Sequence, residues 1–341
     1  MSEEEKRTRK GAGDRRGSPP QEEGETALIG WQGISAVVPA DWMLAGVGGD
    51  RRQGYLRVDA PWAGGSAPAL QVKWARRHID LERKRAEYIR RLTSGKRRRW
   101  RRGGAWSGLE VTTDLRVVSK RAKPRKDILG YGWRGPQCGL GVLWNCEVCG
   151  RAVIAQVGWP IEEEGRETAQ EVIESLEDHG VGGWDSWGVD GLAFLAPTEY
   201  ELEGWRRMTR YLELRLLRKQ DKLKVARWGM VPLVLGGRSL RDWYEESNRR
   251  RREVRWDSEA REVKGHEGVV AWGEARMLSV KRGARRAMHA VTRSARYAPR
   301  QFGAVAWHCP ESNRLYLVEA LYGGEGEALH GAVESVVCHE E

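Results

Sequence analysis

The chain has few cysteines, almost no phenylalanine and no long hydrophobic run. Five unevenly spaced cysteines in 341 residues exclude a disulfide-based scaffold. No apolar segment reaches the roughly 20 residues of a membrane-spanning helix, and the N-terminal segment lacks the apolar core of a signal peptide. These absences predict a cytoplasmic protein without membrane contact, whose cysteines are buried thiols, metal ligands or a redox pair.

Tryptophan and positive charge are abundant instead. There are 17 Trp against 2 Phe, so Trp supplies much of the aromatic core. The net charge of +11 favours acidic partners such as nucleic acid, an anionic membrane or an acidic protein. An arginine excess also arises from base composition or from the ion-pair networks of heat-adapted proteins, so charge alone does not identify a partner. The length suits two domains.

The order of short sequence matches indicates an internal duplication. Residues 1–27 are rich in charge, Gly and Pro, and we predict a disordered N-terminal tail. The colinear matches pair "GISAVVPADWML" from Gly33 with "GLAFLAPTEYEL" from Gly191, "YLRV" from Tyr55 with "YLEL" from Tyr211, "WNCEVCGR" from Trp144 with "WHCPESNR" from Trp307, and "VIESL" from Val172 with "AVESV" from Ala332. We therefore predict a first copy at 28–182 and a second copy at 183–341, which pack on one another.

Each copy contains the same series of expected elements. Short apolar runs end at Pro39 and Pro197, and alternation of period two in "GYLRVDAP" and "LKVARW" predicts antiparallel strands. Asp80 and Ser239 are candidate N-caps of charge-rich helices, and an apolar stripe at helical spacing predicts a closing helix. The expected fold class is α+β: two tandem copies of a domain with an antiparallel sheet and flanking helices, related by a pseudo-twofold axis.

The beginning and end of each copy resemble the PsbP-like superfamily. The similarity lies in the strand that runs into Pro and an aromatic ("VVPADW", "LAPTEY"), and in a late strand followed by a helix ending in "ESL" or "ESV". The resemblance covers most of residues 28–341. It implies a small α+β binding module without shared catalytic residues, so it assigns no site.

The "CEVCG" motif at Cys146 and Cys149 is open to three interpretations: a plain hairpin turn, half of a zinc site, or a redox pair. Cys138 could add a third ligand. The matching turn of the second copy carries His308 and Cys309, so facing copies would bring four ligands together. The zinc hypothesis therefore assigns Cys146, Cys149, His308 and Cys309 as ligands.

Two basic clusters occupy similar places in the two copies. Cations able to bind phosphates, with an aromatic able to stack on a base, are typical of single-stranded nucleic-acid binding. The alternative is a set of solvated loops with the Trp side chains turned inward. The candidate binding residues are Arg97, Arg98, Arg99, Trp100, Arg101 and Arg102 in the first copy and Arg249, Arg250, Arg251, Arg252 and Trp256 in the second.

No pattern in the chain requires catalysis. Phosphate-binding loops, metal-binding helices with paired His and catalytic triads are all missing from the sequence. We therefore expect a non-catalytic binding or assembly module with a basic Arg/Trp face that engages nucleic acid or another acidic partner. The alternatives are a protein-interaction scaffold with incidental charge, and a zinc-stabilised or redox protein that uses the Cys motif. Zinc is the one cofactor that the sequence suggests.

Overall fold

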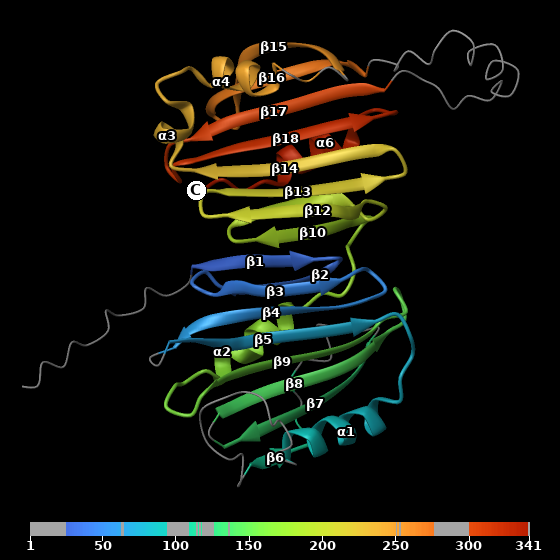
Figure 1. Cartoon of the computed structure of the whole chain (residues 1–341). Helices are drawn as coiled ribbons and strands as arrows, with labels where there is room; N and C mark the ends of the chain where they lie inside the picture. Colours follow the sequence, from blue (N-terminus) through green and yellow to red (C-terminus); the bar gives the residue numbers. More distant parts are fainter. Residues whose placement is uncertain are drawn as a thin grey trace, which may run out of the picture.

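The computed structural model describes residues 25–62, 65–93, 109–113, 115, 117, 126–135, 137–249, 251, 254–275 and 300–339. These residues form three antiparallel sheets of four, seven and seven strands (Figure 1). We call residues 25–182 the first half and residues 183–339 the second half. Each half contains one of the seven-stranded sheets.

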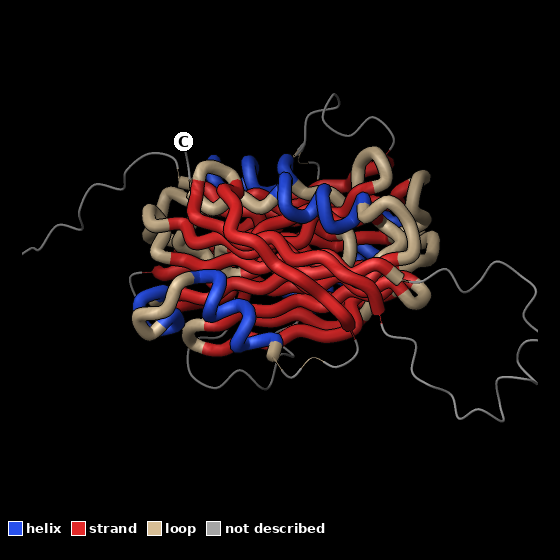
Figure 2. The backbone as a smooth tube through the Cα atoms, turned by 90° about the horizontal axis from the view of Figure 1, so that it is seen from above, coloured by secondary structure: helices blue, strands red, loops and turns tan. Residues whose placement is uncertain are grey.

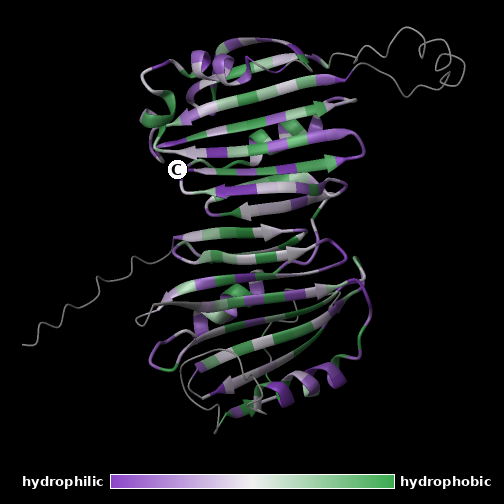
Figure 3. Ribbon diagram, viewed as in Figure 1, coloured by the Kyte–Doolittle hydropathy of each residue, from purple (hydrophilic) through white to green (hydrophobic). Residues whose placement is uncertain are grey.

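The seven-stranded sheet of the first half has the strand order β3-β4-β5-β9-β8-β7-β6. Buried residues alternate with more exposed ones along β4, while β8 is buried along most of its length. Figure 3 colours the same strands by hydropathy. This pattern indicates that both faces of the sheet are covered at β8. The strands are β3 (Met43–Gly49), β4 (Gln53–Trp62), β5 (Gly65–Ala75), β6 (Glu110–Thr112), β7 (Lys126–Arg134), β8 (Gln137–Cys146) and β9 (Ala152–Pro160).

The sheet of the second half repeats this order as β12-β13-β14-β18-β17-β16-β15. Both sheets also carry a β-bulge at the same place, between Leu44 and Gly46 in the first half and between Leu202 and Gly204 in the second. The strands are β12 (Glu201–Met208), β13 (Tyr211–Arg218), β14 (Asp221–Gly229), β15 (Val254–Val263), β16 (His266–Ala275), β17 (Gln301–Cys309) and β18 (Arg314–Tyr322).

Strand register corrects one of the sequence matches. Leu56 of β4 lies opposite Val72 of β5, and Leu214 of β13 lies opposite Val225 of β14. The bulges on the neighbouring strands β3 and β12 also lie at matching positions relative to Leu56 and Leu214. Tyr55 therefore corresponds to Glu213 and not to Tyr211. The sequence match was wrong by two residues, a shift that keeps every side chain on its own face and so preserves the alternation.

The four-stranded sheet joins the two halves. Each half contributes one hairpin, and the order β11-β10-β1-β2 places the two hairpins edge to edge, with Gly30 opposite Gly188. A Cβ on Gly30 would lie 2.4 Å from the Ser186 oxygen, and a Cβ on Gly188 would lie 2.3 Å from the Leu28 oxygen. Only glycine fits this close approach. The strands are β1 (Thr26–Trp31), β2 (Ile34–Pro39), β10 (Trp184–Val189) and β11 (Leu192–Pro197).

Side chains also cross between the halves. Arg51 forms an ion pair with Asp185 and donates to the Tyr200 oxygen at 3.0 Å. In the opposite direction, Arg207 donates to the Leu44 oxygen at 3.0 Å. One continuous cluster of buried apolar residues includes members of both halves, among them Trp31 and Trp187. The two halves therefore share a core.

The helices lie on the outer sides of the strands (Figure 2). Asp80 and Ser239 cap α1 and α4 as predicted, because their side chains accept from the amides of Arg83 and Asp242. The closing helix α2 buries the predicted apolar stripe, and α6 likewise buries one apolar side. The described helices are α1 (Leu81–Thr93), α2 (Arg166–Ser175), α3 (Val231–Leu235), α4 (Leu240–Asn248) and α6 (Glu327–Ser335).

The predicted α+β fold class was wrong, since the described residues are mostly strand. The charge-rich segment of β15 shows the reason: "VRWDSEAREV" is full of polar residues, yet all ten of its residues pair with β16. Pairing along a neighbouring strand outweighs weak local preference.

The N-terminal hairpin was also missed in part, because β1 begins at Thr26, inside the predicted tail of residues 1–27. Among the described helices, none has the length and apolar character that crossing a bilayer would require.

Candidate metal centres

Four potential metal ligands converge in the first half. Cys146 is the last residue of β8, Cys149 lies in the turn before β9, and Asp178 and His179 follow α2. The Cys146 sulfur lies 3.5 Å from His179 Nδ1, and the Cys149 sulfur lies 3.4 Å from Asp178 Oδ2. We call these four residues the first centre.

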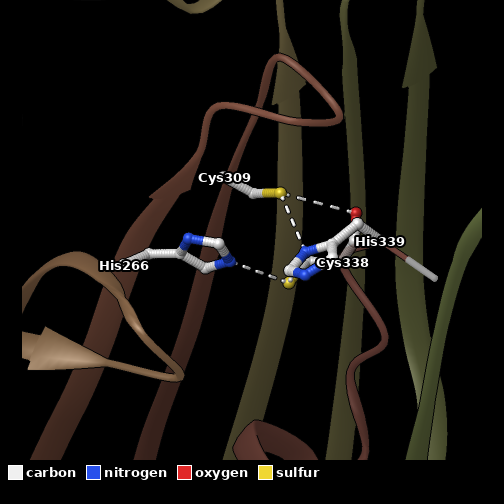
Figure 4. Close-up of side chains that lie close together, drawn as sticks. All are labelled: His266, Cys309, Cys338 and His339. Carbon is white, nitrogen blue, oxygen red and sulfur yellow. Dashed lines mark hydrogen bonds between the residues drawn. The ribbon is translucent and has the colours of Figure 1, made fainter. Parts of the chain in front are cut away.

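The second half contains a matching group, the second centre, formed by His266, Cys309, Cys338 and His339 (Figure 4). His339 Nδ1 lies 3.4 Å from the Cys309 sulfur and 3.3 Å from the Cys338 sulfur, and His266 Nε2 lies 3.4 Å from the Cys338 sulfur. Three of the four residues are buried, and His339 is partly buried.

Three ligand positions are equivalent in the two centres. Cys146 and Cys309 end equivalent strands, while Asp178 and His179 correspond to Cys338 and His339 after the closing helices. The fourth ligand comes from a different element in each half. In the first half the fourth ligand is Cys149 of the turn before β9, and Ser312 stands at this position in the second half. In the second half the fourth ligand is His266 at the start of β16, and Lys126 stands at this position in the first half.

The spacing of the ligand atoms fits a tetrahedral metal site. In each centre the four atoms lie within 4.8 Å of one another. Zinc bonds of about 2.0–2.3 Å place tetrahedral ligand atoms roughly 3.3–3.8 Å apart, close to the separations above. Two thiols with two imidazoles is a typical zinc donor set, and two thiols, one imidazole and one carboxylate also suits zinc.

Neighbouring side chains hold the ligands of the first centre in place. The Trp144 indole N–H donates to Asp178 Oδ2 at 3.1 Å, which orients the carboxylate. Arg151 donates to the Asp178 carbonyl oxygen at 2.7 Å. In the second half Trp307 occupies the position of Trp144. Burial, followed by the neighbouring Cys309, raises the pKa of the Cys338 thiol.

The electrostatics of the Cys motif disfavour a redox role. Burial, followed by the nearby Asp178 carboxylate, raises the pKa of Cys149 to about 12. A reactive thiol needs a lowered pKa, which a helix N-terminus or a nearby cation would provide. The five cysteines are free thiols, and Cys146 ends a strand in a hairpin instead of preceding a helix.

The predicted single site between the copies is replaced by two centres, one in each half. Cys146 and Cys149 belong to the first centre and Cys309 belongs to the second, whereas His308 joins neither, since it adjoins Cys309 on a strand and points to the opposite face. The sequence prediction missed Asp178, His179, His266, Cys338 and His339. Extending the "VIESL"/"AVESV" match by a few residues would have aligned Asp178-His179 with Cys338-His339. His266 has no counterpart of ligand type in the first half, so a match between the two halves could not have revealed it.

The predicted basic clusters are only partly within the described residues. Arg97, Arg98, Arg99, Trp100, Arg101, Arg102, Arg250 and Arg252 lie outside them. Arg251 pairs with Glu319 at 2.6 Å and sits over the Phe302 ring, while Trp256 packs edge-on against Tyr244. Arg249 is exposed. Arg251 and Trp256 therefore contribute to packing within the second half.

The chain matches no family model, and no curated protein is significantly similar to it. The resemblance to the PsbP-like superfamily stays a prediction.

Proposed function

We propose that the chain is a non-catalytic zinc protein that binds one ion in each half, and that the two ions stabilise the fold. The observation that supports this most strongly is the repetition of the four-ligand cluster at equivalent places in the two halves. The second half keeps four ligands although Ser312 stands at the position of Cys149. A chance cluster would not be expected to survive the exchange of one ligand element for another.

The place of each centre indicates a structural role. After α2, Glu177 exchanges two backbone hydrogen bonds with Ser35 of β2, at 2.8 and 2.9 Å. The next two residues are ligands of the first centre. An ion bound there would link the β8–β9 turn to the segment that leaves α2, and this segment is itself bonded to β2. Four protein ligands also fill a tetrahedral shell, so no position is left for a substrate.

Elemental analysis of the purified chain tests the proposal, with two zinc ions expected per molecule. Cys146→Ser and Cys309→Ser should each reduce the content to one, and the double variant should bind none. Cys138→Ser is the matched control, because Cys138 is a partly buried thiol that belongs to neither centre. Zinc content well below one per chain after purification with zinc would refute the proposal, as would an equal loss in Cys138→Ser.

A further inference from the structure

The first half has an open groove beside α1, lined by β4, β5, β9 and the turn between β3 and β4. The groove encloses about 910 Å³, within the range of ligand sites. Ala75, Ala152 and Ile154 form part of its lining, and Tyr88 of α1 lies along one side. We call it the cationic groove, after the charges on its walls.

At the equivalent place of the second half, the described residues are larger and pack together. The strand registers show that Ala75, Ala152 and Ile154 of the first half are equivalent to Trp228, Leu315 and Leu317 of the second. Leu315 and Leu317 form a buried apolar cluster with Val231 of α3, and the partly buried Trp228 packs against it. The first half passes from β5 to α1 without such a helix, so the same part of the sheet is left open. The two halves differ here, because apolar side chains fill this place in the second half and a groove is left open in the first.

The walls of the cationic groove carry a strong excess of positive charge. Among the described residues of its lining, Asp50 is the one carboxylate, and it accepts from the backbone amides of Arg52 and Gln53. The lining cations are Arg52, Lys73, Arg76, Arg77, Lys84 and Arg91. Lys84 pairs with Glu87. Within the described residues, Arg52, Lys73, Arg76 and Arg77 form no salt bridge, so their charges are available to an anionic ligand.

Tyr55 adds an exposed aromatic surface to the same groove. Its side chain is 48% exposed although it is large and partly apolar. The ring packs over Gly48 of β3, where a Cβ would come within 2.5 Å of it. The glycine thus lets one side of the ring rest on backbone while the other remains accessible. Glu213, at the equivalent position of the second half, is buried.

From these features we propose that the cationic groove binds single-stranded nucleic acid. Arg52, Lys73, Arg76 and Arg77 contact phosphates, and a base stacks on Tyr55. Separate cations along a groove with an aromatic platform match the way single strands are bound without sequence preference. An acidic peptide would use the cations but would give Tyr55 no base to stack on. The inference concerns a different surface from the metal centres and does not depend on them.

Fluorescence anisotropy of the full chain with a labelled single-stranded oligonucleotide of about 12 nucleotides tests the proposal. Binding at about 50 mM salt should weaken steeply by about 200 mM. The double variant K73Q/R76Q should lower affinity about tenfold and reduce the salt slope by about 1.4, the value for two lost phosphate contacts on a single strand. Tyr55→Ala should weaken binding about tenfold, whereas Tyr55→Phe should retain it because Phe still stacks.

R255Q/R261Q is the matched control, since it removes the same charge from exposed positions of β15 in the second half. It should stay within about twofold of the unmodified chain. The proposal is overturned if no oligonucleotide binds at low salt, if both double variants weaken binding equally, or if polyglutamate competes better than the oligonucleotide. The zinc content and the thermal midpoint of the groove variants should equal those of the unmodified chain. A loss of oligonucleotide binding in these variants is then distinct from a failure of the metal proposal.

Discussion

Arg151 is a buried cation that connects the first centre to the sheet between the halves. Its guanidinium donates to the backbone oxygens of Arg51, Asp178 and Gln32, at 3.0, 2.7 and 2.9 Å. Burial lowers its pKa, so the three carbonyl oxygens are needed to stabilise the charge. The equivalent Arg314 makes one longer bond, to the Gly191 oxygen at 3.3 Å.

Arg151→Met should therefore lower the free energy of unfolding by about 3 kcal/mol, because it leaves buried carbonyls without donors. Arg314→Met is the control and should cost less than about 1 kcal/mol. Urea denaturation of both variants measures the difference. Equal losses would mean that the bonds of Arg151 contribute little.

The Cys149 thiol makes the stability of the metal-free protein depend on pH. Its pKa is raised to about 12 in the folded chain, against an ordinary value of 9.0. The folded state therefore holds this proton more tightly than the unfolded state, and the stability it provides is lost as pH rises from about 9 towards 12. We expect the thermal midpoint of the metal-free protein to fall over this range, and to fall less in Cys149→Ser. The same fall in both proteins would contradict this assignment.

At the level of elements, the join between β1 and β10 depends on two glycines. Any side chain on Gly30 would collide with the Ser186 oxygen of the opposite strand. This edge-to-edge pairing also covers the edges that the two hairpins would otherwise expose. The contact between the halves thus depends on backbone approach as much as on side-chain packing.

Gly30→Val should separate the two strands and lower the free energy of unfolding by about 3 kcal/mol or more. Gly229→Ala serves as the control, because its added Cβ would have open space and its backbone has no positive φ. Thermal denaturation of the two variants compares them directly. A neutral Gly30→Val would show that the strands can move apart at little cost.

At the level of the whole molecule, the shared core and the shared sheet predict one cooperative unfolding transition. Each metal centre belongs to one half, but both halves contribute to the same apolar cluster. Loss of either ion should therefore destabilise the entire chain, and not just the half that held it.

Removal of zinc with a chelator should lower the single thermal midpoint, since each ion stabilises by about 2.7 kcal/mol when free zinc exceeds the dissociation constant roughly 100-fold. Cys146→Ser or Cys309→Ser alone should lower the thermal midpoint by about half as much as the removal of both ions. The double variant should no longer respond to the chelator. Scanning calorimetry measures all of these. Two separate transitions would show that the halves unfold independently.

Local features were predictable from the sequence because they depend on neighbours along the chain. Strands β2 and β11 end at Pro39 and Pro197, the helix caps lie at Asp80 and Ser239, and Cys146 lies at the tip of a hairpin, all as expected. The amount of strand was not predictable, since polar segments such as β15 become strands only through their partners.

The candidate metal ligands show the limit of prediction from residues that are close in the sequence. Cys146 and Cys149 were visible as a pair because their spacing is short. Asp178 lies about 30 residues further on and meets them only because α2 packs on the sheet and returns the chain to the turn. His266 meets Cys338 through an even longer separation. Periodicity and capping were thus determined by the sequence alone, whereas the composition of each centre was decided by tertiary structure, because only the folded path of the chain brings distant ligands within bonding distance of one ion.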